Sequence, residues 1–129
     1  MRRTSSLLVV LAACGGQQKP APPSEMKQLA AQLDADVAAV VRIVHDNRSD
    51  CPALAAALKK QFALMQPAID RAHRVQSDPA RAKELTTEMH AYDAKAAEYG
   101  KSIERDFTVD APCARDAAVR EVMVTMPTL

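Results

Sequence analysis

Two pairs of acidic and imidazole side chains have the chemistry and spacing of metal ligands. Asp70-x-x-His73 and His90-x-x-Asp93 each place a carboxylate and a histidine on adjacent turns of a helix, if these segments are helical. Carboxylate-bridged metal centres in helical bundles use two Glu-x-x-His motifs and two further glutamates. Here the pairs use aspartate, run in opposite orders and flank the apolar positions. We therefore favour solvated i,i+3 pairs and keep these four residues as a weaker metal hypothesis.

Two cysteines form a second candidate group. Cys51 and Cys113 each lie beside a proline where a helix is expected to begin. A disulfide between them would stabilise the fold by about 4 kcal/mol in the chain-entropy description. A thiol at a helix N-terminus also has a lowered pKa, so a reactive or metal-binding pair is an alternative, as are two free thiols. The sequence has no C-x-x-C motif and no histidine close to either cysteine, so we predict the disulfide.

The sequence gives less support for haem ligation or catalysis than for a disulfide. The chain has three histidines and six methionines, but no C-x-x-C-H haem attachment motif. Met26, Met65 and Met89 occupy apolar helical positions, where methionine usually fills a core. There is no G-x-S-x-G turn and no glycine-rich phosphate loop. The sequence therefore predicts no cofactor and no enzymatic activity.

The elements that would carry these residues are four amphipathic helices. Apolar residues recur every three or four positions in four segments. The first runs from a cap at Ser24 to about Asn47; the second starts after a cap at Asp50, with a kink expected near Pro67. The third is a single helix from Ser77 or Asp78 to Phe107. The fourth is short, with Asp110 as candidate cap and Pro127 as its end.

Four such helices joined by short connections predict an all-α fold, an antiparallel up-down-up-down four-helix bundle. Leu33, Phe62, Leu85 and Ile103 are expected in its core. The alternative is a longer coiled coil between chains, since the third stripe spans nearly four heptads. In a square bundle the second and fourth helices are diagonal, whereas disulfide-bonded Cα atoms lie within about 7 Å. The fourth helix would then have to lean across the end of the bundle.

The N-terminus carries a different signal. Arg2 and Arg3 precede an apolar run, Leu7 to Ala13, which ends at Cys14 and is followed by a polar, proline-rich stretch. Leu11-Ala12-Ala13-Cys14 resembles the lipobox of bacterial lipoproteins. The resemblance implies a diacylglyceryl group on the Cys14 thiol, cleavage before Cys14 and N-acylation of the new terminus. Residues 1–13 are then a signal peptide, 14–23 a flexible tether, and 24–129 the helical domain.

The same resemblance implies a location in the bacterial cell envelope. The protein would be anchored to a lipid bilayer through Cys14, because acyl chains give stable attachment when more than one is present. Gly15 stands where enteric lipoproteins carry the aspartate that retains them in the inner membrane. This implies the outer membrane, with the domain facing the periplasm.

Charge and composition disfavour nucleic acid as a partner. The chain has 17 Lys plus Arg and 16 Asp plus Glu. Loss of residues 1–13 would remove Arg2, Arg3 and no acid, which leaves 15 against 16, a net charge of −1. Such a chain has no basic excess for phosphates. Its four aromatic residues also provide little surface for stacking bases.

Two functions therefore fit the sequence. The first is an interaction or accessory module that binds another envelope protein. The second is a carrier that holds a metal, haem or small apolar molecule inside the bundle. An interaction module should have a packed interior and an exposed apolar groove, whereas a carrier should have a sizeable apolar cavity or a bound metal.

Overall fold

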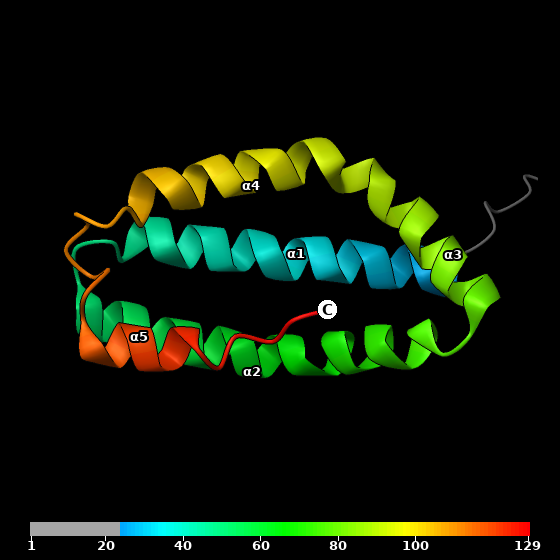
Figure 1. Ribbon diagram of the computed structural model, residues 1–129, viewed down its shortest axis with the longest axis horizontal. Helices are drawn as coiled ribbons and strands as arrows, with labels where there is room; N and C mark the ends of the chain where they lie inside the picture. Colours follow the sequence, from blue (N-terminus) through cyan, green and yellow to red (C-terminus); the bar gives the residue numbers. More distant parts are fainter. Residues whose placement is uncertain (1–23) are drawn as a thin grey trace, which may run out of the picture.

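The structure is a computed structural model that describes residues 24–129, and this part of the chain is helical without strands. Cys14 and the rest of the lipobox lie outside the described residues. The elements are α1 (Glu25–Asp46), α2 (Cys51–Gln76), α3 (Pro79–Met89), a 3-10 turn η1 (His90–Tyr92), α4 (Asp93–Asp106) and α5 (Ala117–Met123) (Figure 1). The prediction of an all-helical domain is confirmed.

Three of the predicted N-caps are confirmed by side-chain hydrogen bonds. Ser24 accepts from the amide of Lys27 at 3.1 Å, which caps α1. Asp50 and Asp78 do the same at the starts of α2 and α3. Each side chain satisfies an amide that has no partner within its helix, which explains why the helices begin at these positions. α2 continues as one helix through Pro67.

The prediction of a single third helix is wrong, because a 3-10 turn divides it. α3 ends at Met89, η1 covers His90–Tyr92 and α4 begins at Asp93. Figure 1 shows the chain changing direction between α3 and α4, and both segments contact α1. A 3-10 turn tightens the backbone and changes the direction of the apolar stripe. Periodicity alone could not reveal this bend, since the spacing of apolar residues continues across it.

The start and end of the last helix also differ from expectation. Asp110 is not the cap; Asp116 is, and its side chain accepts from the amide of Val119 at 2.9 Å. Residues 108–116 form successive turns instead, with hydrogen bonds from Ala111 to Thr108 and from Asp116 to Cys113. α5 then ends at Met123, before Pro127, and a non-helical tail, residues 124–129, follows.

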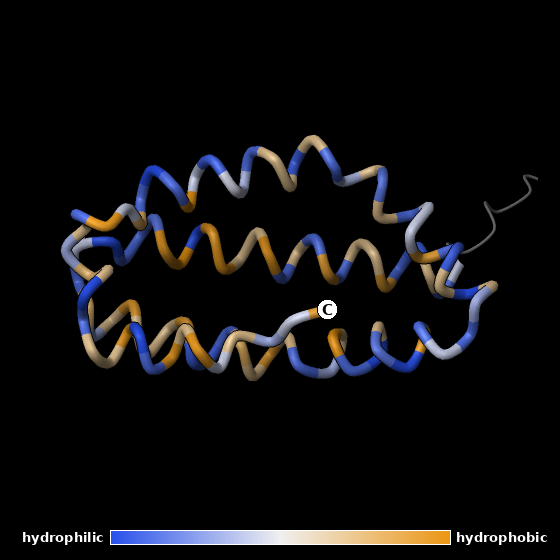
Figure 2. Tube along the Cα trace, viewed as in Figure 1, coloured by the Kyte–Doolittle hydropathy of each residue, from blue (hydrophilic) through white to orange (hydrophobic). Residues whose placement is uncertain are grey.

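α1 is the central helix of the packing. It contacts α2, α3 and α4, whereas α5 packs against α2. Figure 2 shows hydrophobic residues along much of α1, whereas α4 is mostly hydrophilic. The buried apolar residues form two clusters. One joins α1 to the second half of α2 and to α3, and the other joins the end of α1 to the first half of α2, to Cys113 and to α5.

Three of the four expected core residues are buried. Leu33, Phe62 and Leu85 belong to the clusters, but Ile103 of α4 is only partly buried. Ile103 is less covered because α4 packs chiefly on α1. The two clusters meet on α1 near Asp36, a buried acidic residue that lies between Leu33 and Val40 in sequence.

Candidate functional site

An apolar groove lies over α1 and consists of two adjoining hollows. The larger has a volume of about 420 Å³ and is bordered by α1, α2, the end of α3, η1, α4 and the C-terminal tail. The smaller, of about 360 Å³, is bordered by α1, α4, α5 and Met126 of the C-terminal tail. The residues common to both are Val37, Val40, Ala96, Tyr99 and Met126. We call these two hollows together the apolar groove.

The groove exists because α5 is short and because α4 lines it partly with small residues. α5 has 7 residues and ends at Met123, so among residues 24–129 no helix covers the middle of α1 on this side. Ala96 and Gly100 of α4 line the groove, and a Cβ atom added at Gly100 would meet nothing within 4 Å. Along α1 the floor runs from Leu33 to Val44, which is about 16 Å at the rise of an α-helix.

A small polar cluster lies at one side of the groove and ties α4 to α1. The Tyr99 hydroxyl donates to Asp34 Oδ1 at 3.1 Å. Lys95 Nζ lies 3.8 Å from Asp34 Oδ2 and 5.5 Å from the centre of the Tyr92 ring. Burial raises the pKa of the Tyr99 hydroxyl, and its hydrogen bond and proximity to Asp34 add to the effect. The groove is thus apolar along its floor, with its charged groups confined to this cluster.

The C-terminal tail forms the remaining wall. Met126 borders both hollows, and Pro127, Thr128 and Leu129 border the larger one. His73 Nε2 of α2 lies 2.9 Å from the Thr128 carbonyl oxygen, which only accepts, so His73 donates this hydrogen bond. Figure 1 shows the tail continuing from α5 alongside α2 and ending near the middle of the molecule.

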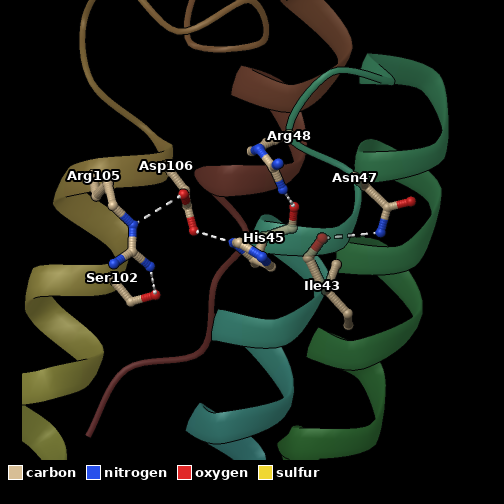
Figure 3. A network of polar contacts seen from close by, with 7 residues as sticks. All are labelled: Ile43, His45, Asn47, Arg48, Ser102, Arg105 and Asp106. Atoms are coloured by element: carbon tan, nitrogen blue, oxygen red, sulfur yellow. Dashed lines mark hydrogen bonds and ion pairs between the residues drawn. The ribbon is translucent and has the colours of Figure 1, made fainter.

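A polar network closes the end of the molecule where α1 and α4 finish (Figure 3). His45 Nδ1 lies 2.9 Å from Asp106 Oδ2, and Arg105 Nε lies 3.5 Å from Asp106 Oδ1. The hydrogen bond from His45 lowers the pKa of Asp106 against the opposing effect of burial, and Arg105 lowers it further. A carboxylate that orients a histidine is also found in catalytic triads. In a triad, however, the other imidazole nitrogen is hydrogen-bonded to a nucleophile. Ser102 hydrogen-bonds to Arg105 instead.

The two cysteines lie at the same end. Cys51 and Cys113 are at disulfide distance, with their Cα atoms 5.2 Å apart, as predicted. α5 packs directly against α2, so the diagonal separation of a square bundle does not arise. Cys113 is fully buried, next to Leu54 and Val119 in one apolar cluster. The pair therefore fastens the segment before α5 to the first turn of α2.

The four weaker metal candidates are exposed and separated into local contacts. Asp70 accepts a hydrogen bond from Gln66, and His73 contacts the tail. His90 Nδ1 lies 3.1 Å from Asp93 Oδ2, and this pair spans the 3-10 turn between α3 and α4. Among residues 24–129, no three His, Cys, Asp or Glu side chains converge as a metal site would require. The structure does not bring the two Asp/His pairs together.

Several contacts of the site were not predicted from the sequence. Asp34 and Tyr99 are 65 positions apart, and His45 and Asp106 are 61 positions apart. No local spacing indicates such pairs, because they form only when α4 packs on α1. The groove had a weak signal in the sequence: the last apolar stripe is short, and the third contains Ala96 and Gly100 where larger residues would fill space.

Comparisons with known proteins gave no relatives: no family model, no curated protein and no solved structure matches this chain. Within residues 24–129, no helix is long and apolar enough to cross a membrane.

Proposed function

We propose that this protein is a small envelope lipoprotein whose helical domain binds an apolar segment of another envelope protein in the apolar groove. The observation that carries the proposal is the contrast between interior and surface. The interior is packed into two clusters, whereas the groove over α1 stays open and apolar. Val37, on the groove floor, is 42% exposed. An exposed apolar patch bordered by polar residues is typical of an interaction site.

The membrane anchor is the second part of the proposal and rests on the lipobox resemblance at residues 11–14. Cleavage before Cys14 would leave nine residues, 15–23, between the lipid and the capping Ser24. Nine residues span at most about 30 Å, so the domain would stay near the membrane surface. We place it on the outer membrane, facing the periplasm. The proposal includes neither catalysis nor nucleic-acid binding.

Lipidation is tested by metabolic labelling with a fatty acid. The wild-type protein should carry the label, and the Cys14→Ser variant should lack it and accumulate as an uncleaved precursor. A Cys51→Ser variant serves as the control, since it removes a cysteine outside the lipobox and should keep the label. Label retained in the Cys14→Ser protein would contradict the anchor.

We also propose that the four helical segments form an antiparallel up-down-up-down bundle, with α3 and α4 together as its third member. The short connections at 47–50 and 77–78 favour this order for the first three members, because neighbouring helices joined by a few residues run in opposite directions. The 47–50 connection and the segment between α4 and α5 lie at one end in Figure 1, and the connection between α2 and α3 lies at the other.

Partner binding is tested by photo-cross-linking in living cells. A photoreactive amino acid at position 37, in the groove, should yield a discrete cross-linked product with a second envelope protein. The matched control is position 64 on α2. Leu64 is 63% exposed and apolar but does not line the groove, so it should yield no such product. Equal products at both positions would contradict recognition through the groove.

A small apolar ligand is the second candidate function. The larger hollow, about 420 Å³, falls within the roughly 300–1,000 Å³ of ordinary ligand sites. Its lining is almost wholly apolar, so the ligand would be a hydrocarbon chain or a similar molecule. Mass spectrometry of the protein extracted under native conditions separates the two functions. A stoichiometric small molecule favours the carrier, and a second polypeptide favours the interaction module.

A further inference from the structure

The methionines of this protein are concentrated around the apolar groove. Five methionines lie within residues 24–129, and four of them border the two hollows. They come from three helices and the C-terminal tail: Met65, Met89, Met123 and Met126. The fifth, Met26, lies in the core cluster that joins α1 to α2 and α3. A methionine side chain is unbranched and polarizable, so it adapts to apolar surfaces of different shape, and its thioether is readily oxidised.

We propose that Met126 is an oxidation site, and that its conversion to the sulfoxide prevents the groove from binding its partner. The inference rests on the proposed function of the groove and adds a chemical modification that controls it. The oxidant belongs to the class of hypohalous acids, with hypochlorous acid as the representative. Three observations support the choice of Met126: its exposure, its position in the groove and its place outside the core.

Exposure separates Met126 from the other methionines. Its side chain is 42% exposed, whereas Met26 is 2% exposed and Met65 is 5% exposed. Met89 and Met123 are half-buried. Because an oxidant in water must reach the sulfur lone pair, the order of oxidation follows the exposure of the side chains. Met126 should therefore be oxidised first, and Met26 and Met65 should be protected while the fold is intact.

The reaction is a transfer of oxygen to the thioether. The lone pair of the Met126 sulfur attacks the oxygen of hypochlorous acid, and an S–O bond forms as the O–Cl bond breaks. Chloride leaves with the electron pair of that bond, and the hydroxyl proton passes to water. The sulfur is oxidised by two electrons and the chlorine is reduced by two. A polar sulfoxide then stands in the place of an apolar thioether.

The position of Met126 makes this change important for binding. Met126 borders both hollows, and the other residues common to them are apolar except for the Tyr99 hydroxyl. That hydroxyl already donates its hydrogen bond to Asp34. An apolar partner seated in the groove would therefore bury the sulfoxide oxygen without a donor. Burial of an acceptor without a hydrogen-bond partner should weaken binding by about tenfold or more.

Met126 also lies outside the parts of the molecule that hold the fold together. It follows the end of α5 at Met123 and belongs to neither of the two buried clusters. Its amide bonds to the Met123 carbonyl through the backbone, which oxidation of the side chain leaves unchanged. A loss of binding on oxidation of Met126 would thus report on the groove and not on unfolding.

The test uses the full-length protein in living cells, with the photoreactive amino acid at position 37. Cells receive a graded series of hypochlorous acid doses before irradiation. Mass spectrometry of the tryptic peptide 121–129 measures the sulfoxide, and fragmentation of this peptide separates Met123 from Met126. The wild type should lose the cross-linked product in parallel with the oxidation of Met126.

Two variants assign the loss to Met126. Met126→Leu keeps an apolar side chain without a thioether, so it should keep the product at doses that abolish it in the wild type. Met126→Gln places an amide of similar size beside the groove and should reduce the product without any oxidant. Met26→Leu is the matched control, since it removes a methionine outside the groove and should respond as the wild type does. Cooperative unfolding of each purified variant in urea verifies that it is folded.

The outcomes separate the inference from the proposed function. Loss of the product that follows Met126 oxidation and is absent in Met126→Leu supports the inference. Equal loss in both proteins, or a product that persists when Met126 is oxidised, overturns it and leaves the proposed function standing. Oxidation of Met65 as early as that of Met126 overturns it as well. Absence of a position-37 product in untreated wild-type cells contradicts the proposed function and, with it, the control of binding by oxidation.

Discussion

His45 Nδ1 lies 2.9 Å from Asp106 Oδ2 and joins the last turn of α1 to the last residue of α4. The two residues are 61 positions apart, so the contact fixes one end of α4 against α1. The Asp106 side chain is only 7% exposed, whereas that of His45 is 49% exposed. A hydrogen bond to a buried carboxylate is electrostatically stronger than one on the open surface, because the protein interior has a lower effective dielectric constant than water.

The first prediction concerns stability in acid. The pKa of Asp106 is lowered in the folded protein, chiefly by the hydrogen bond from His45. The folded state thus favours the ionised form, and this contribution to stability is present above the ordinary aspartate value of about 3.9. It is lost as the pH falls through the lowered value. Asp106→Asn should therefore flatten the dependence of unfolding free energy on pH below about 4.

Urea unfolding at a series of pH values measures this effect. His45→Gln removes the main cause of the shift and should weaken the same acid dependence while Asp106 stays in place. Parallel curves for the wild type and the Asp106→Asn variant would show that Asp106 does not contribute through its ionisation.

The second prediction concerns the disulfide. Cys113 precedes α5, which has 7 residues and is marginal without tertiary support. Reduction should therefore loosen α5 and the tail first, while α1 to α4 keep most of their protection from hydrogen exchange. Hydrogen-exchange mass spectrometry with and without reductant measures this, and a non-reduced digest should contain the two cysteine peptides joined. Simultaneous loss of protection in all helices would contradict the local role.

The third prediction concerns Asp36, which is 6% exposed. Its Oδ1 accepts from Gln32 Nε2 at 2.9 Å, but its Oδ2 has no hydrogen-bond partner among residues 24–129. A buried polar atom without a partner costs about 1–3 kcal/mol. Asp36→Leu should therefore raise the free energy of unfolding by an amount of that order.

The measurement is the urea midpoint, with an unchanged m-value as evidence that the same surface is exposed on unfolding. Asp36→Asn keeps the size of the side chain but replaces one carboxyl oxygen by an NH2 donor, so it separates the effect of a polar group at this site from that of the carboxyl group. A lower midpoint for Asp36→Leu would mean that the carboxyl group makes a net stabilising contribution.

The fourth prediction compares two apolar residues that were both expected in the core from the sequence. Phe62 is buried in the cluster near the disulfide, whereas Ile103 is partly buried beside the groove. Phe62→Ala should cost about 3–5 kcal/mol, in the range of buried aromatic truncations. Ile103→Ala should cost clearly less, because part of its surface already contacts water. Equal losses would indicate that the groove is closed in solution.

The sequence alone determined the helical character of residues 24–129, most of the helix starts and the pairing partner of Cys51. These features depend on neighbours in the chain or on composition. Ser24, Asp50 and Asp78 cap helices because their side chains reach amides two or three residues away. Cys113 followed as the partner because lipidation of Cys14 would leave only two cysteines.

Tertiary structure decided what local patterns could not express. The bend at His90–Tyr92 preserves apolar spacing, so it becomes visible only when α3 and α4 pack on α1. Asp116, and not Asp110, caps α5 because the preceding segment folds into turns around the buried Cys113. The groove arises because α5 stops at Met123, so that within residues 24–129 no helix lies over the middle of α1 on this side. Whether an apolar stripe is buried or open depends on which helix lies opposite it, and a single stripe carries no information about its neighbour.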